Sequence, residues 1–407
     1  MPPTTLHRSH ETNAWQVFLI FLRLGLTSFG GPVAHLGYFR AEFVARRRWL
    51  SENAYADLVA LCQFLPGPAS SQLGMALGLR QGGLAGALAA WVGFALPSAL
   101  VMALFGLGLV TNPELLPAGV LHGLKVAAVG VVAQAVWSMG RGLCRGPLRL
   151  LLMAVACAFT LLLPGLAGQL SAMLLAALAG WGLWGRVGVA PVQPVQPVHD
   201  IPRSGLRAGT GAALLLLFAA LLLLLPMAAR AWPQAWLQLA DAFYRAGALV
   251  FGGGHVVLPL LQAELVAPGW VTQDDFLAGY GVAQAVPGPL FTFAAFLGAV
   301  ARHGAGGWAG AVVSLVAIFA PGFLLVAGTL PFWERLRQNA RVRAALSGVN
   351  AAVVGILAAA LYDPVWSSSI HAPADIFLAL AVFAELMWGR MPPWLVVPLC
   401  GVMGMWL

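Results

Sequence analysis

Two kinds of group interrupt the long apolar runs of this chain, and both suit the binding of an anion. Arg23, Lys125 and Arg245 place positive charge inside otherwise hydrophobic segments. A charge at the centre of a membrane helix is costly, so it usually faces a cavity or a partner. The motifs Phe29-Gly30-Gly31-Pro32 and Pro66-Gly67-Pro68 interrupt a helix, because glycine frees the backbone and proline lacks an N–H donor.

Broken helix inside a bilayer is tolerated where the freed backbone lines a cavity or is buried in protein. A helix that begins just after Gly31 or Pro68 directs its free N–H groups and the positive end of its dipole at the break. The two breaks are therefore candidate cradles for an oxyanion. The alternative is a plain helix break that packing requires.

Polar side chains flank both breaks. His35 follows the glycines and Gln63 precedes the Pro-Gly-Pro motif. Histidine titrates near neutral pH and could couple protons, although a lone histidine is more often structural. Gln63 is a neutral donor that could reach an oxyanion, with helix packing as the alternative.

The same pattern occurs a second time. FYRAGALVFGGGHVVLPLL (243–261) matches FLRLGLTSFGGPVAHLG, a second Pro-Gly-Pro follows, and Gly123 pairs with Gly348. This indicates a tandem duplication of nearly the whole chain. The site candidates of the second copy are Arg245, Gly252, Gly253, Gly254, His255, Gln284, Pro287, Gly288, Pro289 and Asn350, the last standing opposite Lys125.

The composition predicts an integral membrane protein. Of the 407 residues, 60% are hydrophobic and 9% are charged, against roughly 25% charged in soluble domains. The apolar runs are long enough for membrane helices of about 20 residues. The net charge of +8 reports the placement of loops rather than nucleic-acid binding.

The fold predicted is an all-α polytopic membrane protein of two inverted homologous repeats with discontinuous helices or re-entrant hairpins. Its expected parts are a polar tail (1–13), a first repeat (14–185), a Pro-rich cytoplasmic linker (186–207), an extra transmembrane helix (208–229) and a second repeat (235–407). Repeats of this kind, with broken helices meeting near the midplane, are typical of secondary transporters.

Two topologies fit the apolar segments. In the preferred one, 14–48 and 53–79 are re-entrant hairpins, followed by spans at 84–110, 119–139, 148–166 and 169–185. This model puts most of the 22 Lys and Arg residues on the cytoplasmic side. The alternative, in which every segment spans, places the arginines of 335–343 outside.

The buried cations also have a structural interpretation. They could snorkel to an interface or form ion pairs with Asp57, Asp241 or Glu385. If they are functional instead, symmetry would bring Arg23 and Arg245 near one axis as part of a basic anion site. The chain has no phosphate-loop, HExxH or CxxC motif, so neither an enzyme nor a cofactor or metal site is expected.

The doubled pattern, FGGPVAHLG then PGP and FGGGHVVLP then PGP, closely resembles the chromate ion transporter (CHR) family in its long, two-domain form. The resemblance covers residues 14–139 and 235–363 well. It implies a multi-pass protein of the bacterial inner membrane that exports chromate and gives chromate resistance, with sulfate as a competing ligand. The family's motif residues fall on Gly30, Gly31, Pro32, His35, Pro66, Gly67 and Pro68, and on Gly252, Gly253, Gly254, Pro287, Gly288 and Pro289.

Three hypotheses follow. The first is a secondary transporter that exports chromate by alternating access around a basic midplane site, driven by membrane potential or proton motive force. The second is a carrier of sulfate or oxyanions in general, an importer included. The third is a membrane sensor or scaffold without transport. The oligomeric state is left open, a homodimer included.

Overall fold

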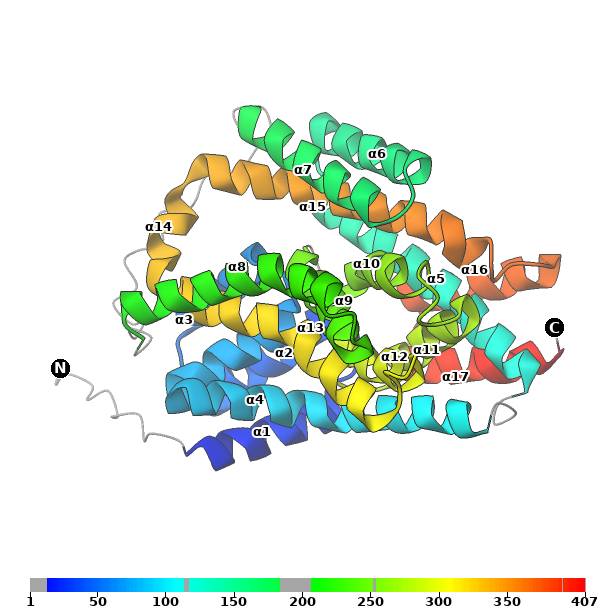
Figure 1. Ribbon diagram of the computed structural model, residues 1–407, viewed down its shortest axis with the longest axis horizontal. Coiled ribbons are helices and arrows are strands. Elements are labelled where there is room, and N and C mark those ends of the chain that lie inside the picture. Colours follow the sequence, from blue (N-terminus) through cyan, green and yellow to red (C-terminus); the bar gives the residue numbers. More distant parts are fainter. Residues whose placement is uncertain (1–12, 113–116, 184–205, 252–253, 390, 407) are drawn as a thin grey trace.

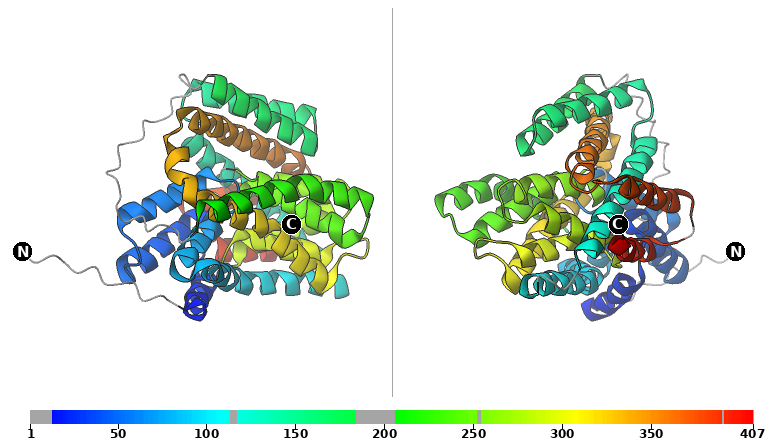
Figure 2. Two further views of the ribbon diagram at one scale, coloured as in Figure 1. Left: turned by 60° about the vertical axis from the view of Figure 1, so that its left-hand side comes forward. Right: turned by 90° about the vertical axis from the view of Figure 1, so that its right-hand side faces the viewer.

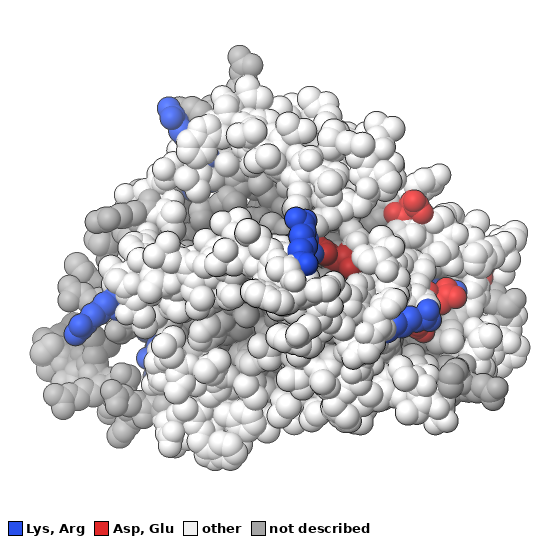
Figure 3. Space-filling view, in the orientation of Figure 1, with Lys and Arg blue, Asp and Glu red and all other residues white. Residues whose placement is uncertain are grey.

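The protein is seen in a computed structural model that describes residues 13–112, 117–183, 206–251, 254–389 and 391–406 (Figure 1). All regular structure in these residues is helical. The elements long and apolar enough to cross a membrane are α4 (Ala69–Thr111), α5 (Ala118–Leu143), α8 (Ala208–Ala231), α13 (Gly307–Thr329) with its following 3-10 turn, and α15 (Ala340–Ala360) with its following π-helical turn. The face drawn in Figure 3 carries few charges. The chain is an all-α polytopic membrane protein, as predicted.

The first predicted break separates α1 from α2. α1 (Ala14–Thr27) ends at Ser28, and α2 (Gly31–Phe39) follows Gly30, whose φ of 96° lies in the left-handed region. The 14 residues of α1 cover about 21 Å. A hydrocarbon core is about 30 Å thick, so α1 alone is too short to cross it, as the hairpin interpretation requires.

The Pro-Gly-Pro motif separates α3 (Glu52–Phe64) from α4. α4 is itself two helices, because Gly82 and Gly83 leave the helical conformation. A Cβ on Gly78 would lie 2.3 Å from the backbone oxygen of Gly86. The parts of α4 on either side of the break therefore pack backbone against backbone.

The second half repeats this arrangement. Its shorter helices are α9 (Ala235–Leu249), α10 (Val257–Leu265), α11 (Gln273–Ala285) and α12 (Phe293–Val300). A Cβ on Gly298 of α12 would lie 2.2 Å from the backbone oxygen of Gly310 in α13. This contact corresponds to the one between the two parts of α4.

Equivalent helices of the two halves run in opposite directions. In Figure 1, the part of α4 that follows Gly83 runs from left to right, whereas α13 runs from right to left. Opposite directions in this pair are what an inverted second repeat would give, and the inversion of the whole repeat stays a prediction.

The two halves exchange their last helices. α5 packs against α16 (Pro373–Trp388) and α17 (Pro393–Met403), whereas α15 packs against α6 (Pro147–Leu162) and α7 (Leu166–Gly182). Figure 2 shows α6 and α7 lying over α15.

Glycines make these crossings close. A Cβ on Gly123 would lie 2.1 Å from the backbone oxygen of Cys400, and one on its repeat partner Gly348 would lie 2.1 Å from that of Ala176. Neither half can therefore complete its packing without the other.

α6 and α7 are shorter than predicted. Segments 148–166 and 169–185 were expected to span, but the helices have 16 and 17 residues, or about 24 and 26 Å. Both fall short of a hydrocarbon core of about 30 Å. Proline and glycine at 164 and 165 end α6 and start α7, which shortens both.

Ion pairs hold the charged segment that follows α2, which is the π-helical stretch Arg40–Arg46 and the start of α3. Glu42 accepts hydrogen bonds from Arg46 and Arg47, whose ion pairs measure 2.9 and 2.6 Å, and Arg40 pairs with Glu52 at 2.8 Å. The hydrogen bond from Arg40 holds the pKa of the Glu52 carboxyl below its usual value.

Changing Gly348 to Ala should destabilise the protein by about 1–3 kcal/mol, because the added methyl group meets the backbone of α7. Gly142→Ala in α5 is the matched control, since a Cβ there meets nothing within 4 Å. Thermal unfolding in detergent compares the two. Equal melting temperatures would contradict the close crossing of α7 and α15.

Candidate functional site

The four helix breaks meet in two pairs across the repeats. They are the first Gly-Gly turn (28–31), the described residues on either side of the second Gly-Gly motif (250–251 and 254), and the Pro-Gly-Pro turns (65–68 and 286–289). The backbone N–H of Gly67 donates to the carbonyl oxygen of Val250 at 2.7 Å, and that of Gly288 donates to Ser28 at 2.9 Å. Ser28 and Val250 are equivalent positions, and so are Gly67 and Gly288. Each Pro-Gly-Pro turn is thus bound to the Gly-Gly turn of the other repeat.

Only glycine suits the centres of the Pro-Gly-Pro turns. Gly67 and Gly288 have φ of 121° and 100°, a region that side chains disfavour. A Cβ on Gly67 would also lie 2.9 Å from the Gln72 side chain, and one on Gly288 would lie 2.8 Å from Ser98 Oγ. Both turns are therefore fixed by conformation and by space.

Each Pro-Gly-Pro turn packs on a long helix of the other repeat. Gly67 approaches Gly322 of α13, beside Pro321, and Gly288 approaches Ser98 of α4, beside Pro97. The Gln72 amide donates to Pro66 O at 2.8 Å and so ties the first turn of α4 to its own break.

His35 joins the two turns of the first repeat. It is buried, with Nε2 3.2 Å from the Ser28 carbonyl oxygen and Nδ1 3.3 Å from Ser70 Oγ. A carbonyl can only accept, so Nε2 carries the hydrogen and Nδ1 of the neutral ring accepts from the Ser70 hydroxyl. His255 of the second repeat differs, because its Nδ1 lies 3.0 Å from the Tyr280 hydroxyl.

Hydrogen-bond donors gather at the turns of the first repeat. The caps of α2 and α4 are Gly30 and Pro68, neither of which binds the first-turn N–H groups with a side chain. The hydroxyls of Ser28 and Ser71 are buried without a hydrogen-bond partner. Uncapped helix N-termini bind anions. The turns of the first repeat thus carry donors of the kind that bind oxyanions.

The three predicted cations lie on different helices and have different surroundings. Arg23 is exposed on α1. Lys125 pairs with Asp274 at 2.9 Å, and Arg245 pairs with two carboxylates, including Asp241 at 2.9 Å. In an apolar chain the nearest carboxylate neutralises a buried cation, so ion pairing, the structural alternative, applies to Arg245.

The other predicted site residues differ in how deeply they are buried. Gln63 is exposed, whereas Gln284 keeps its amide nitrogen buried without a partner, as an anion donor would. Asn350 is half-buried on α15, and Gly254 is buried where the second Gly-Gly turn ends. The backbone of Pro32 lies in the first turn of α2. Gly252 and Gly253 lie outside the described residues.

Sequence reasoning missed the hydroxyl groups at the turns. The sequence analysis did not single out Ser28, Ser70 and Ser71, although Ser70 and Ser71 lie two and three residues after the Pro-Gly-Pro motif, in the first turn of α4. Small polar residues in the first turn after a break were the available signal.

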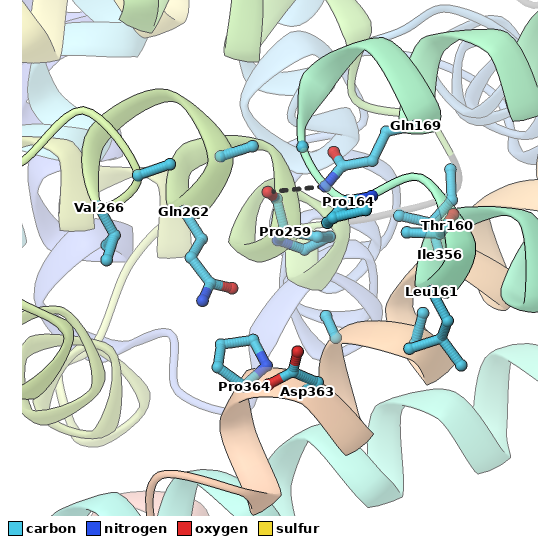
Figure 4. Close-up of a pocket in the computed structure, with 15 residues that line it drawn as sticks. Thr160, Leu161, Pro164, Gln169, Pro259, Gln262, Val266, Ile356, Asp363 and Pro364 are labelled. Carbon is cyan, nitrogen blue, oxygen red and sulfur yellow. Dashed lines mark hydrogen bonds between the residues drawn. The ribbon is translucent and has the colours of Figure 1, made fainter.

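A cavity of about 250 Å³ lies away from the predicted residues (Figure 4). It lies between the α6–α7 connection, α10 and the end of α15, and none of the predicted site residues lines it. At its edge the Gln169 amide donates to Pro259 O at 3.2 Å. Gln169 thereby links α7 of the first repeat to α10 of the second.

The fold and these paired turns define a polytopic membrane protein with helices broken inside the apolar region, as in membrane carriers. A family model described as chromate transporter matches residues 15–181 and 237–405, so the chain belongs to the chromate transporter family. Membership makes it a transporter and not an enzyme.

Relatives match over nearly the whole chain. A chromate transport protein of Pseudomonas aeruginosa is 30% identical over 91% of this chain and 85% of its own. A probable chromate transport protein of Synechococcus elongatus is 28% identical over 98% and 97%, and a chromate transport protein of Cupriavidus metallidurans is 27% identical over 95% and 92%. No solved structure matches.

Gly67→Ala should destabilise the protein more than Gly269→Ala. Both residues have positive φ, which costs about 1–2 kcal/mol for a side chain. Only Gly67 adds a clash, because a Cβ on Gly269 meets nothing within 4 Å. Thermal unfolding measures the difference, and equal losses would show that the Pro-Gly-Pro turn is not tightly held.

Proposed function

We propose that this protein exports chromate across the bacterial inner membrane as a secondary transporter and so gives chromate resistance. The support from relatives is the family membership and the names of the chromate transport proteins that align with nearly the whole chain. The observation that carries the site is the pairing of turns across the repeats, with uncapped helix starts and buried hydroxyls beside them.

Chromate suits donors of this kind. It is a tetrahedral dianion whose four oxygens accept hydrogen bonds, and helix N-termini with their N–H groups attract such anions. The proposed ligands are the first-turn N–H groups of α2 and α4 and the hydroxyls of Ser28 and Ser71. This replaces the basic site predicted from the sequence with a site of neutral donors. Sulfate has the same shape and is the expected competitor.

The membrane potential is sufficient to drive efflux. Moving one charge through 100 mV is worth about 2.3 kcal/mol, so a dianion that leaves a negative interior gains about 4.6 kcal/mol. At about 1.4 kcal/mol for each tenfold ratio, this supports a gradient of roughly a thousandfold.

Alternating access follows from the paired turns. The hydrogen bonds Gly67–Val250 and Gly288–Ser28 stand at equivalent positions of the two repeats. We propose that one pair opens while the other stays closed, so that the anion is reached from one side of the membrane at a time.

The test measures chromate uptake by everted membrane vesicles under an imposed interior-positive potential. Export predicts uptake that depends on the potential and falls when sulfate is added. Ser71→Ala should raise the half-saturating chromate concentration about tenfold or more, because it removes a hydrogen bond to a charged ligand.

Ser314→Ala is the matched control, since Ser314 Oγ of α13 is also buried without a partner but packs against Gly298 of α12. Equal effects of both changes would contradict the proposed site. Flux of sulfate without chromate would favour a general oxyanion carrier, and no flux of either would favour a sensor or scaffold.

A further inference from the structure

A charge cluster with unequal numbers of acids and bases lies beside the second Gly-Gly turn. Nη2 of Arg245 contacts both Asp241 Oδ2 and Glu264 Oε2 at 2.9 Å. The two carboxylate side chains are only 8% and 7% exposed. Asp241 Oδ1, Glu264 Oε1 and Arg245 Nε are buried with no hydrogen-bond partner. One guanidinium is therefore shared by two buried carboxylates.

The surroundings supply little to balance Glu264. α10, which carries it, packs against α7, α9, α15 and the 3-10 turn 254–256. α7 has no charged residue, α15 has Arg341 and Arg343 only in its first turn, and His255 in the 3-10 turn contacts Tyr280. α9 contributes Asp241 and Arg245 themselves.

A second cation acts on only one of the two acids. Arg230 of α8 interacts electrostatically with Asp241, whereas the charges acting on Glu264 are those of Arg245 and Asp241. Burial and a like charge both disfavour ionisation of a carboxyl group. Glu264 shares its arginine with Asp241 and is therefore the acid on which a proton would relieve the repulsion between the two carboxylates.

The equivalent residue of the first repeat lacks this arrangement. Glu42 aligns with Glu264 but lies on the π-helical stretch Arg40–Arg46, where it pairs with two arginines, Arg46 and Arg47. Leu19 stands where the second repeat has Asp241. The shared arginine and two buried acids thus belong to the second repeat alone, in the described residues.

The cluster also bridges the two arms of one hairpin. Arg245 lies on α9, before the second Gly-Gly turn, and Glu264 lies on α10, after it. A proton on Glu264 would remove the charge that Arg245 binds. The contact between α9 and α10, the two arms of the hairpin, would then weaken. The turn itself holds Gly67 of the first repeat through Val250.

We propose that Glu264 is a proton-binding site whose protonation and release are coupled to oxyanion transport. The step is a simple exchange: a proton adds to one carboxylate oxygen, the neutral acid forms, and the same O–H bond breaks on release. This inference rests on the proposed function, because the coupled movement is that of the transported anion.

The test uses purified protein in liposomes at alkaline pH, where chromate is fully dianionic. With the membrane potential clamped at zero, a pH difference across the membrane should drive net chromate movement in the wild type. If one proton moves in each cycle, the steady-state chromate ratio should change about tenfold per pH unit. With no pH difference, an imposed potential should also drive chromate.

Two variants separate the site from the fold. Glu264→Gln should keep potential-driven flux and lose the pH-driven part. Asp241→Asn should also keep potential-driven flux and lose the pH-driven part, although Glu264 is still present. Without the second carboxylate, Arg245 pairs with Glu264 alone, and Glu264 stays ionised. Glu42→Gln, at the equivalent position of the first repeat, should keep both fluxes.

The outcomes are distinguishable. Potential-driven flux without any pH-driven flux in the wild type overturns the proton site but leaves the transport proposal standing. This comparison needs no variant, so it decides even if Glu264→Gln fails to fold. Retention of pH-driven flux by Glu264→Gln also overturns the assignment. No anion flux under either force removes the transport proposal and this inference with it.

Discussion

A broken helix in a bilayer exposes backbone groups that no water can satisfy, and this constraint organises the structure. The protein meets it by binding the breaks of one repeat to those of the other. Gly67 donates to Val250, and Gly288 donates to Ser28. The glycines permit the positive φ that each turn needs, and the other repeat supplies the acceptor. The same breaks leave the first turns of α2 and α4 without side-chain caps, which makes them suitable for an anion.

Because the halves exchange their last helices, each half depends on the other for its packing. α5 packs on α16 and α17, and α15 packs on α6 and α7, at glycines in equivalent positions. The charges do not follow this symmetry. Glu42 pairs with two arginines of its own, whereas Glu264 shares Arg245 with a second buried acid, Asp241. A symmetric frame of turns therefore carries an asymmetric distribution of charge, which permits one half to respond to protons.

Much of the fold was predictable, because glycine and proline mark the helix breaks in the sequence and recur at matching positions in both halves. The breaks at Gly30 and Gly67 lie where predicted. The binding of each turn to the opposite repeat was not predictable, since it depends on tertiary packing that no spacing reveals. The sequence could not show how the predicted cations are partnered. Arg245 pairs with carboxylates of its own repeat, and Arg23 is exposed. Hydroxyl groups such as that of Ser71 carry no charge, so they are harder to recognise in an apolar sequence than arginine or lysine.

The most direct measurement is hydrogen exchange of the backbone amides with and without saturating chromate, read by mass spectrometry over the whole chain. If the paired turns bind the anion, chromate should slow exchange in the first turns of α2 and α4, at residues 31–35 and 69–72. The peptides around Lys125 and Asp274 should not change. Protection at that ion pair with none at the turns would contradict the account.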